Sequence, residues 1–545
     1  MDKRHALFFL IGLFCLPFVA FGQERYAVHY KYKPNIDFNL EEPEKFLTQR
    51  AIERRLKEGV ELDSTDLPVS SKYIEEVTAK ADLVHYHSKW MNASVVVATA
   101  GQVEEISQLP FVDFVKLVGK GFYSADHSGK EELVETAAGF RTSSEMKRSY
   151  EFQNDMLGIP AMHKAGYTGK GVMIALLDAG FLNADKIPGM KHLFAENKIV
   201  ATKDFVLPGS EDVFRTDGHG TASLSLVAAY EESKLIGGAY DSQFILCITE
   251  DVESEYRIEE YNWVRAAEFS DSIGVDIINS SLGYNYFDDP EMNYNTRDMD
   301  GNTAVISKGA SLAAQKGILV VSSVGNEGND SWETVTAPAD AEGILSIGAV
   351  NSMLARSSFS SIGPTADGRI KPELAAFGSG VTIWRRGEDT SFSSGTSFSS
   401  PQIAALAAGL WQAKPDWTKD QLIDNLLKSG NLADSPDNEL GYGIPNFTDA
   451  YLGKIMDREE ENETVLSVIY PNPLEGDQLY IEFGREKNCN IRMFTTSGTL
   501  VRDTNLDRIS HRYPYQMTLA NTPPGLYLVE CKENGTPKVF RLVKK

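Results

Sequence analysis

A serine-rich segment, residues 393–406, combines residue types and spacing that could carry out chemistry. Five of its first eight residues are serines, and apolar residues then recur at helical spacing from Ile403 to Leu410, which predicts a buried helix. Pro401 is tolerated only near the first turn of that helix, so the helix should begin near Ser397. Because the free N–H groups and the dipole at a helix start favour developing negative charge, Ser397 is the candidate nucleophile among the five serines.

Two more reactive side chains occur where the sequence predicts a strand end or a helix start. Asp178 directly follows the apolar strand 172–177, and His219 lies between two glycines just before a predicted helix over 221–230. Taken alone, each is an ordinary residue of a turn or a helix cap. Together with Ser397 they are the three groups of nucleophilic acyl transfer, in which histidine takes the serine proton, aspartate fixes the imidazole and serine attacks.

A fourth group is needed because acyl transfer develops negative charge on the carbonyl oxygen of the substrate. Asn326 follows the predicted strand 317–322, and its side-chain amide is a suitable hydrogen-bond donor to that oxyanion. On its own, a Gly-Asn pair is only a turn signal. Asn326 is therefore a candidate oxyanion donor because of the three other residues.

The four segments that hold these residues resemble the signature segments of the subtilisin-like serine proteases, the subtilase family. The segments are residues 175–180, 217–222, 323–326 and 394–401. They occur in the chain order Asp, His, Ser, which is one of the known orders for this geometry. The resemblance implies a catalytic triad of Asp178, His219 and Ser397 and an oxyanion donor at Asn326.

The resemblance also implies where a substrate would bind. An extended strand would pair with the substrate backbone by β-augmentation, and a second segment would help to line the pocket. These residues are Ser281, Leu282 and Gly283 in the first segment and Ser323, Val324 and Gly325 in the second. Neither segment carries a charge, which favours an apolar or broad cleavage preference. One departure from the family pattern is Ala179, where a serine or threonine usually follows the aspartate and can orient it through its hydroxyl.

The elements around these residues predict an α/β fold. Between residues 151 and 455, near-continuous apolar strands alternate with helical stretches, as in a parallel sheet with helices on both faces. Such sheets place their sites at the carboxyl ends of the strands, where Asp178 and Asn326 occur. We therefore expect residues 151–455 to form a subtilisin-like catalytic domain.

Residues 23–118 have the pattern of a separate small domain. Strand-like and helix-like stretches alternate in the order β-α-β-β-α-β, with the first helix expected over residues 42–57, which predicts a ferredoxin-like α+β unit. This unit resembles a subtilase propeptide, which assists folding and blocks the active site until it is cleaved. The polar residues 119–150 predict an exposed linker that contains the processing region.

The C-terminal part of the chain has the pattern of a small β-sandwich. After an acidic linker at residues 456–464, about seven short strand patterns separated by turn residues fill residues 465–545. This region resembles the C-terminal sorting domain of the type IX secretion system of Bacteroidetes. The resemblance implies that the secretion machinery carries the protein through the periplasm and outer membrane to the cell surface or the medium. A carbohydrate-binding or adhesion sandwich is the alternative.

The N-terminus and the overall charge restrict the compartment and the partners. Residues 1–22 join a positively charged start to an apolar run and small residues, which predicts a cleaved secretory signal peptide. No later stretch approaches 18 consecutive apolar residues, so we expect no integral membrane segment after that cleavage. The net charge of −24, from 53 basic and 77 acidic residues, disfavours binding to a nucleic acid.

The expected chemistry requires no cofactor. Two features leave open whether the chain binds a structural calcium ion and whether it forms a disulfide bond. Asp298 and Asp300 begin a pattern that resembles a calcium loop, in which hard cations bind clustered oxygens. Gly309 stands at the twelfth position, where a glutamate is needed, so a solvated loop is favoured over structural calcium. Cys489 and Cys531 could pair in an oxidising compartment.

The sequence therefore predicts a secreted serine endopeptidase that acts on proteins or peptides and is made as a zymogen with its own propeptide as a partner. A non-catalytic surface or adhesion protein on the same scaffold is the alternative, although that role would not require all four site residues. An esterase or lipase is disfavoured because a Gly-x-Ser-x-Gly elbow is absent around Ser397 and the order Ser, Asp, His is not met.

Overall fold

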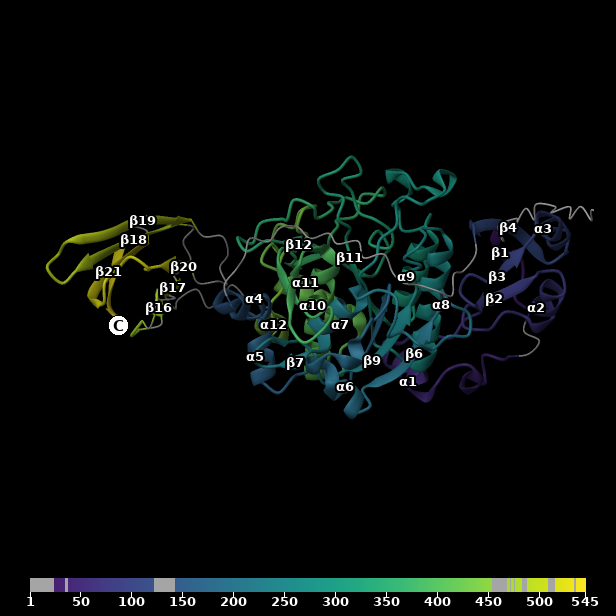
Figure 1. Ribbon diagram of the computed structural model, residues 1–545, viewed down its shortest axis with the longest axis horizontal. Helices are drawn as coiled ribbons and strands as arrows, with labels where there is room; N and C mark the ends of the chain where they lie inside the picture. The colour runs from purple at the N-terminus through teal and green to yellow at the C-terminus, as the bar shows by residue number, and fades with distance from the viewer. Residues whose placement is uncertain are drawn as a thin grey trace, which may run out of the picture.

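The computed structural model describes three modules of the chain (Figure 1). The N-terminal module comprises residues 24–34 and 38–121, the central module residues 143–452, and the C-terminal module residues 468–545 with gaps at 471, 475, 483–487, 508–514 and 534–535. The expected signal peptide, the acidic linker and residues 122–142 of the expected processing linker lie outside the described residues.

The central module is built on a seven-stranded sheet in which all neighbouring strands are parallel. In spatial order its strands are β13 (Leu374–Phe377), β12 (Leu345–Val350), β11 (Leu319–Ser323), β10 (Ile277–Ser280), β5 (Met173–Asp178), β9 (Gln243–Ile248) and β6 (Ile199–Asp204). The strands are buried through the middle of the sheet because helices cover both faces, as their continuous apolar character predicts. The predicted parallel α/β fold is confirmed.

Two pairs of long helices cover the sheet and form two separate cores. Helices α7 (His219–Ala228) and α10 (Thr396–Ala413) pack with one face. Helices α8 (Ile258–Ile273) and α9 (Val305–Gln315) pack with the other. The remaining helices of this module are α4 (Ser143–Met156), α5 (Ile159–Lys164), α6 (Lys191–Ala195), α11 (Lys419–Ser429) and α12 (Phe447–Leu452). None of the described helices is both long and apolar enough to cross a lipid bilayer.

Helix α4 differs from the sequence prediction, because residues 143–150 were expected to be part of an exposed linker. The helix instead begins at Ser143 and runs on into the central module. Tyr150 is buried in the core, and the side chain of Gln153 bonds the backbone of Thr382. Apolar spacing is absent before Tyr150, which explains why the start of the helix was missed.

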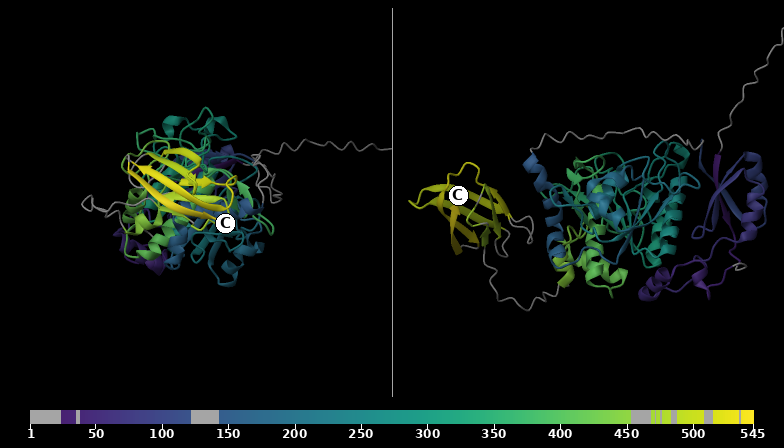
Figure 2. Two further views of the ribbon diagram at one scale, coloured as in Figure 1. Left: turned by 90° about the vertical axis from the view of Figure 1, so that its left-hand side faces the viewer. Right: turned by 60° about the horizontal axis from the view of Figure 1, so that its bottom comes forward.

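The N-terminal module is a four-stranded antiparallel sheet with helices, as predicted. Its strand order is β2 (Leu83–Ser88), β3 (Ala93–Ala98), β1 (Glu24–Tyr30) and β4 (Val112–Gly119). Helices α2 (Ser71–Thr78) and α3 (Ala100–Ser107) contribute Tyr73, Val77 and Ile106 to the core of this module. The other face of the sheet lies against the central module, where Ala27 and Val95 pack with Tyr261 of α8 (Figures 1 and 2).

The first predicted helix of this module is placed differently from the expectation. The amphipathic stretch 42–57 was assigned to the β-α-β-β-α-β unit itself, but α1 spans Gln49–Glu58 and packs on α8 of the central module. Helix α2, which follows it, fills the predicted place on the sheet. The residues that α1 buries include Arg54 and Arg55, so its inward face is charged and its periodicity does not indicate what it packs on.

The C-terminal module consists of two antiparallel sheets around one apolar core. One sheet joins β16 (Val468–Tyr470), β17 (Gln478–Glu482) and β20 (Tyr515–Thr518). The other joins β19 (Leu500–Asp507), β18 (Asn488–Thr495), β21 (Gly525–Glu533) and β22 (Thr536–Lys544). Cys489 and Cys531 are both buried in this core, with no disulfide between them among the described residues. This arrangement agrees with the predicted small β domain.

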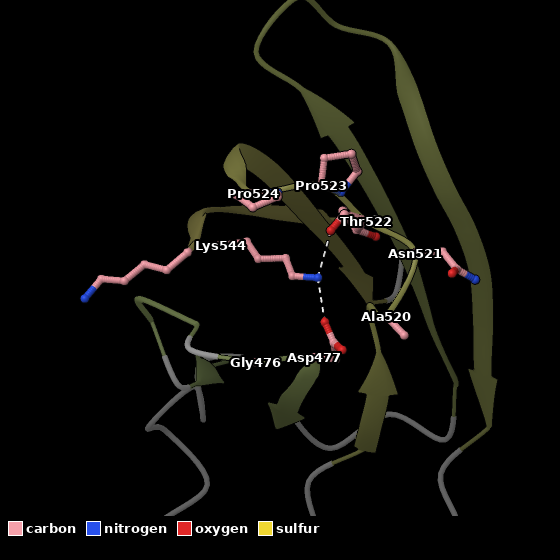
Figure 3. A pocket seen from close by; sticks show the side chains of 9 residues that line it. Gly476, Asp477, Ala520, Asn521, Thr522, Pro523, Pro524 and Lys544 are labelled. Atoms are coloured by element: carbon pink, nitrogen blue, oxygen red, sulfur yellow. Dashed lines mark hydrogen bonds and ion pairs between the residues drawn. The ribbon is translucent and has the colours of Figure 1, made fainter.

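Lys544, near the end of the chain, holds the last strand in the C-terminal module. Its amine donates to the carboxylate of Asp477 and to the carbonyl of Thr522, both at 2.7 Å (Figure 3). It also donates to the carbonyl of Leu519 at 2.6 Å. These three contacts use all three N–H donors of a lysine. Lys544 therefore has no N–H donor left for a ligand in the neighbouring pocket, and its three contacts serve to hold the last strand in place.

A network of ion pairs with little exposure to water joins the N-terminal and central modules. Asp271 of α8, which is fully buried, accepts hydrogen bonds from Arg54, Arg55 and Lys89 at 2.5, 2.9 and 3.1 Å. Burial alone would raise the pKa of the Asp271 carboxyl, but the three cations outweigh it and hold that pKa well below its usual range. Arg55 also pairs with Asp66 of its own module.

We expect Asp271→Ala to weaken the attachment of the N-terminal module strongly. The change leaves three cations without their common partner, and breaking such a buried pair typically costs about 3–5 kcal/mol. The thermal unfolding midpoint of the full-length chain measures the effect, in a background of Ser397→Ala so that the candidate nucleophile is absent. The matched control is Asp424→Ala, because Asp424 forms an exposed pair with Lys428 that is worth at most about 1 kcal/mol. Equal midpoints for the two variants would contradict the prediction.

Candidate active site

The close approach of α7 to the end of β5 places Asp178 beside His219. Asp178 is the last residue of β5, and His219 is the first residue of α7. A Cβ at Gly220 would lie 2.5 Å from the carbonyl oxygen of Gly180 and 3.0 Å from the Cβ of Asp178. Glycine at position 220 is therefore required for the helix to lie this close to the strand end.

The imidazole of His219 is held by the carboxylate of Asp178. Nδ1 of His219 lies 2.7 Å from Oδ1 of Asp178, and the aspartate is fully buried. The backbone N–H of His219 donates to Asp217 at 2.5 Å, which fixes the start of the helix. Burial lowers the pKa of His219, but the Asp178 carboxylate outweighs it, so that pKa is raised above its ordinary 6.5.

Ser397 lies in the first turn of α10, as the sequence predicts. The helix begins at Thr396 after Gly395, whose φ of +152° favours glycine, and Ser397 is 9% exposed. The hydroxyl of Ser397 donates to the carbonyl of Ser281 at 3.1 Å, and the hydroxyl of Ser281 donates back to the carbonyl of Ser397 at 2.8 Å. The candidate nucleophile is thus joined directly to the predicted substrate-binding segment.

His219 faces the start of α10 without a hydrogen bond to Ser397 among the described residues. Its ring centroid lies 5.5 Å from that of Phe398, the residue after Ser397. A hydrogen bond from Ser397 to His219 therefore requires the serine hydroxyl to leave the Ser281 carbonyl. Catalytic hydrogen bonds are often loose in a structure without substrate and become tighter when substrate binds.

Three other serines of the segment make polar contacts within the central module. Ser399 donates to the carbonyl of Ala376, Ser400 donates to Asn279 at 2.8 Å, and Ser394 accepts from the backbone of Gly380. Each of these three hydroxyls therefore bonds a strand or loop of the central module.

Asn326 is oriented by the residue that precedes Ser397. Its amide oxygen accepts from the backbone N–H of Thr396 at 2.9 Å and from the Thr396 hydroxyl at 3.0 Å. Within the described residues, its amide nitrogen makes no hydrogen bond, and the side chain is exposed. The nitrogen is thus available as a donor next to the start of α10.

The two predicted substrate-binding segments lie side by side. The hydroxyl of Ser323 donates to the carbonyl of Leu282, which links the segment 323–325 to the segment 281–283. The backbone N–H of Tyr284 then donates to Ala337 at 2.8 Å, so the first segment leads into an antiparallel bridge.

Polar side chains that the sequence analysis did not assign lie behind these segments. A Cβ at Gly325 would contact Glu327, Ser361 and Thr336, and the Thr336 hydroxyl is buried with no hydrogen-bond partner. Burial raises the pKa of Glu327. The lining near Gly325 is therefore polar, although the two predicted segments carry no charge. Thr336 and Ser361 are far from any sequence motif, whereas Glu327 directly follows Asn326.

The candidate calcium residues are engaged by their own loop. Asp298 accepts from the backbone and side chain of Asn295, and Asp300 accepts from the backbone N–H groups of Asn302 and Thr303. These contacts are those of capping and turn residues, so the carboxylates do not fit a metal site as placed. They favour the solvated loop, and structural calcium stays a prediction.

A second group of carboxylates lies near the candidate triad. Oxygens of Glu250, Glu255 and Glu259 lie within 4.8 Å of one another. Burial raises the pKa of Glu250 to about 7, with a further contribution from Asp178, and raises that of Glu255 to about 9. Burial also raises the pKa of Glu259 well above its usual range. Burial therefore favours the protonated forms of these three carboxyl groups.

Comparison with known protein families agrees with this geometry. A model described as the subtilase family matches residues 169–443, and the chain belongs to this family. A peptidase S8 propeptide domain of Bacteroidota matches residues 25–132, and a secretion system C-terminal sorting domain matches residues 468–545. The chain is thus a subtilisin-like serine peptidase, a hydrolase, with a propeptide and a sorting domain.

Individual relatives are similar at moderate identity. Subtilisin NAT of Bacillus subtilis subsp. natto is 26% identical over 364 residues, which are 66% of this chain and 80% of the relative. Subtilisin of Bacillus pumilus is 29% identical over 274 residues, which are 49% of this chain and 86% of the relative. The solved structure of the prenylagaramide maturation protease PagA is 22% identical with a TM-score of 0.43, covering 54% of this chain and 97% of that one.

The raised pKa of His219 predicts the pH dependence of activity. Histidine must be neutral to accept a proton, so kcat/KM should fall as the pH decreases through a pKa above 6.5. Asp217 contributes to that raised pKa, and Asp217→Asn should therefore move the acid limb to lower pH. The control is Asp212→Asn, which removes an exposed carboxylate from the same loop. Superimposable profiles for the two variants would contradict the prediction.

Proposed function

We propose that the protein is a secreted serine endopeptidase that hydrolyses peptide bonds through Asp178, His219 and Ser397. The observation that carries this proposal is the 2.7 Å contact between His219 and the buried Asp178, held opposite the helix start that bears Ser397. Membership of the subtilase family supports it independently. The substrates are proteins or peptides, which would add a strand beside Ser281–Gly283.

In the proposed mechanism, His219 accepts the proton of Ser397 through Nε2 while its Nδ1 stays bonded to Asp178. Asp178 holds the tautomer and stabilises the imidazolium that forms. The Ser397 oxygen attacks the substrate carbonyl, and His219 then protonates the leaving amine, which leaves an acyl-enzyme on Ser397. Water, activated by His219, hydrolyses the acyl-enzyme and restores the serine.

The oxyanion of the tetrahedral intermediate would be stabilised at the start of α10. The amide nitrogen of Asn326 is one donor, since its oxygen is already used by Thr396. The backbone N–H groups at the helix start and the helix dipole add positive potential at the same place. Because these donors are in position before the substrate arrives, they need no reorganisation during the reaction.

We further propose that the protein is synthesised as a zymogen and exported by the type IX system. The propeptide match and the tight packing of the N-terminal module on α8 support the first point. The sorting-domain match supports a secreted or cell-surface location, and passage through the periplasm and outer membrane follows from that system. A non-catalytic adhesion role is less well supported, because it does not require the contact between His219 and Asp178.

Ser397→Ala is expected to abolish digestion of casein. Replacement of the nucleophile of a triad leaves only the residual rate due to binding and the oxyanion donors, a loss of about 10⁶-fold in kcat in a related subtilisin. Casein hydrolysis is followed with and without a serine-directed phosphonate, which should inactivate only chains that retain Ser397. Ser394→Ala, a change in the same loop, is the control and should retain activity.

The same variant should accumulate with the propeptide still attached if the chain processes itself. Digestion of casein by Ser397→Ala at the parent rate would refute the proposed role of Ser397. Normal processing of the purified variant would instead mean that another protease matures the chain.

Asn326→Ala is expected to lower kcat with little change in KM. Loss of one oxyanion donor costs about 10²–10³-fold in turnover in subtilisin, because the contact forms only in the transition state. Steady-state kinetics on a peptide substrate measure the split between kcat and KM. Asn329→Ala, an exposed asparagine three residues further on, is the control. A rise in KM at constant kcat would place Asn326 in substrate binding instead.

A further inference from the structure

The carboxylate of Asp178 is held at both of its oxygens. Oδ1 accepts from Nδ1 of His219 at 2.7 Å and from the backbone N–H of Ala179 at 2.8 Å. Oδ2 accepts from the hydroxyl of Ser223 at 3.1 Å, and no other donor to Oδ2 occurs in the described part of the chain. Both Asp178 and Ser223 are fully buried, so water does not replace that donor.

Ser223 reaches the carboxylate because of its position on α7. It lies four residues after His219, so the two side chains occupy the same face of the helix, one turn apart. Ser225 on the same helix behaves differently, since its hydroxyl donates to the carbonyl of Ala222 at 2.7 Å. A serine within a helix usually bonds nearby backbone in this way. Ser223 instead directs its proton to another element.

Position 179 explains why such a donor is needed. The residue after Asp178 is alanine, which offers only its backbone N–H to the carboxylate. Without Ser223, Oδ2 would be a buried acceptor with no partner, and the carboxylate could rotate about its bond to Cβ. We propose that Ser223 is a positioning residue for the triad, which supplies from α7 the hydroxyl that position 179 lacks.

The charged groups around Asp178 make its function depend on the orientation that this hydrogen bond holds. Glu250 lies close enough to interact by charge with both Asp178 and His219, which are in direct contact with each other. A rotation of the carboxylate would lengthen its contact with Nδ1 and reduce the stabilisation of the imidazolium. The consequence would appear in turnover and in the state of His219, and it would not appear in substrate affinity.

The experiment compares Ser223→Ala, Ala179→Ser and the double variant in the mature enzyme, with active sites counted by phosphonate titration. Ser223→Ala should lower kcat about tenfold at unchanged KM, as expected for a lost hydrogen bond to a charged group. Its acid limb in the pH profile should shift to lower pH. Adding Ala179→Ser should restore much of kcat, because it returns a hydroxyl to the same carboxylate. Ser225→Ala is the control and should keep kcat.

A second readout does not depend on activity or on maturation. In the full-length chain carrying Ser397→Ala and labelled with ¹⁵N-histidine, the low-field Nδ1 proton of His219 reports its bond to Asp178. Ser223→Ala should move this resonance, and Ala179→Ser should move it back. A resonance and a kcat that both stay unchanged in Ser223→Ala would overturn the inference, as would a loss that Ala179→Ser fails to restore.

The inference rests on the proposed role of Asp178, and the two can fail separately. If Ser397→Ala abolishes hydrolysis while Ser223→Ala changes neither kcat nor the His219 resonance, the proposed function stands and the positioning role is wrong. If Ser397→Ala keeps the parent activity, the proposed function itself is wrong.

Discussion

The distance between helix α7 and the carboxyl end of β5 is the constraint on which the whole active site depends. It is set by backbone packing, since a side chain at position 220 would collide with the Gly180 carbonyl. At this distance, two residues one turn apart on α7, His219 and Ser223, both reach the carboxylate of Asp178. The packing of α7 on β5 therefore sets where the His219 imidazole lies, and its hydrogen bond to Asp178 fixes the side-chain rotamer.

The start of α10 is positioned by a similar use of buried polar contacts. The hydroxyls of Ser281 and Ser397 each donate to the other residue's carbonyl, and Ser400 donates to Asn279 at the end of β10. Such contacts are costly when they are left unmade in a buried site, so they define one register of the helix on the sheet. Polar contacts of this kind account for Ser394, Ser399 and Ser400, three of the five serines in this segment.

Sequence reasoning located the four candidate site residues because each occurs at a strand end or a helix start, which local patterns indicate. It could not find Thr336 or Ser361, which approach Gly325 only through long-range packing. It also identified the missing hydroxyl at Ala179 but not Ser223. Whether Ser223 of α7 can donate to Asp178 depends on how closely α7 packs on β5, which local patterns do not indicate. Helix α1 was misplaced for a related reason: its inward arginines pair with Asp271, and no periodicity indicates a partner in another module.

The charged face of α8 would reconcile tight attachment of the propeptide with the later removal that the proposed zymogen requires. A wholly apolar interface would leave a large hydrophobic patch on the enzyme after cleavage, which is a liability for solubility, whereas here the apolar contacts at Tyr261 lie beside buried charge. Here α8 contributes the carboxylates of Glu268 and Asp271, and the propeptide contributes Arg54, Arg55 and Lys89. Once the propeptide leaves, its cations go with it and the two carboxylates regain water, where the charged forms are stable. The carboxylates are then no longer desolvated. Buried charge therefore makes the interface stable while both partners are present, because losing either partner is costly. When the propeptide leaves, the same carboxylates become hydrated on the surface of α8.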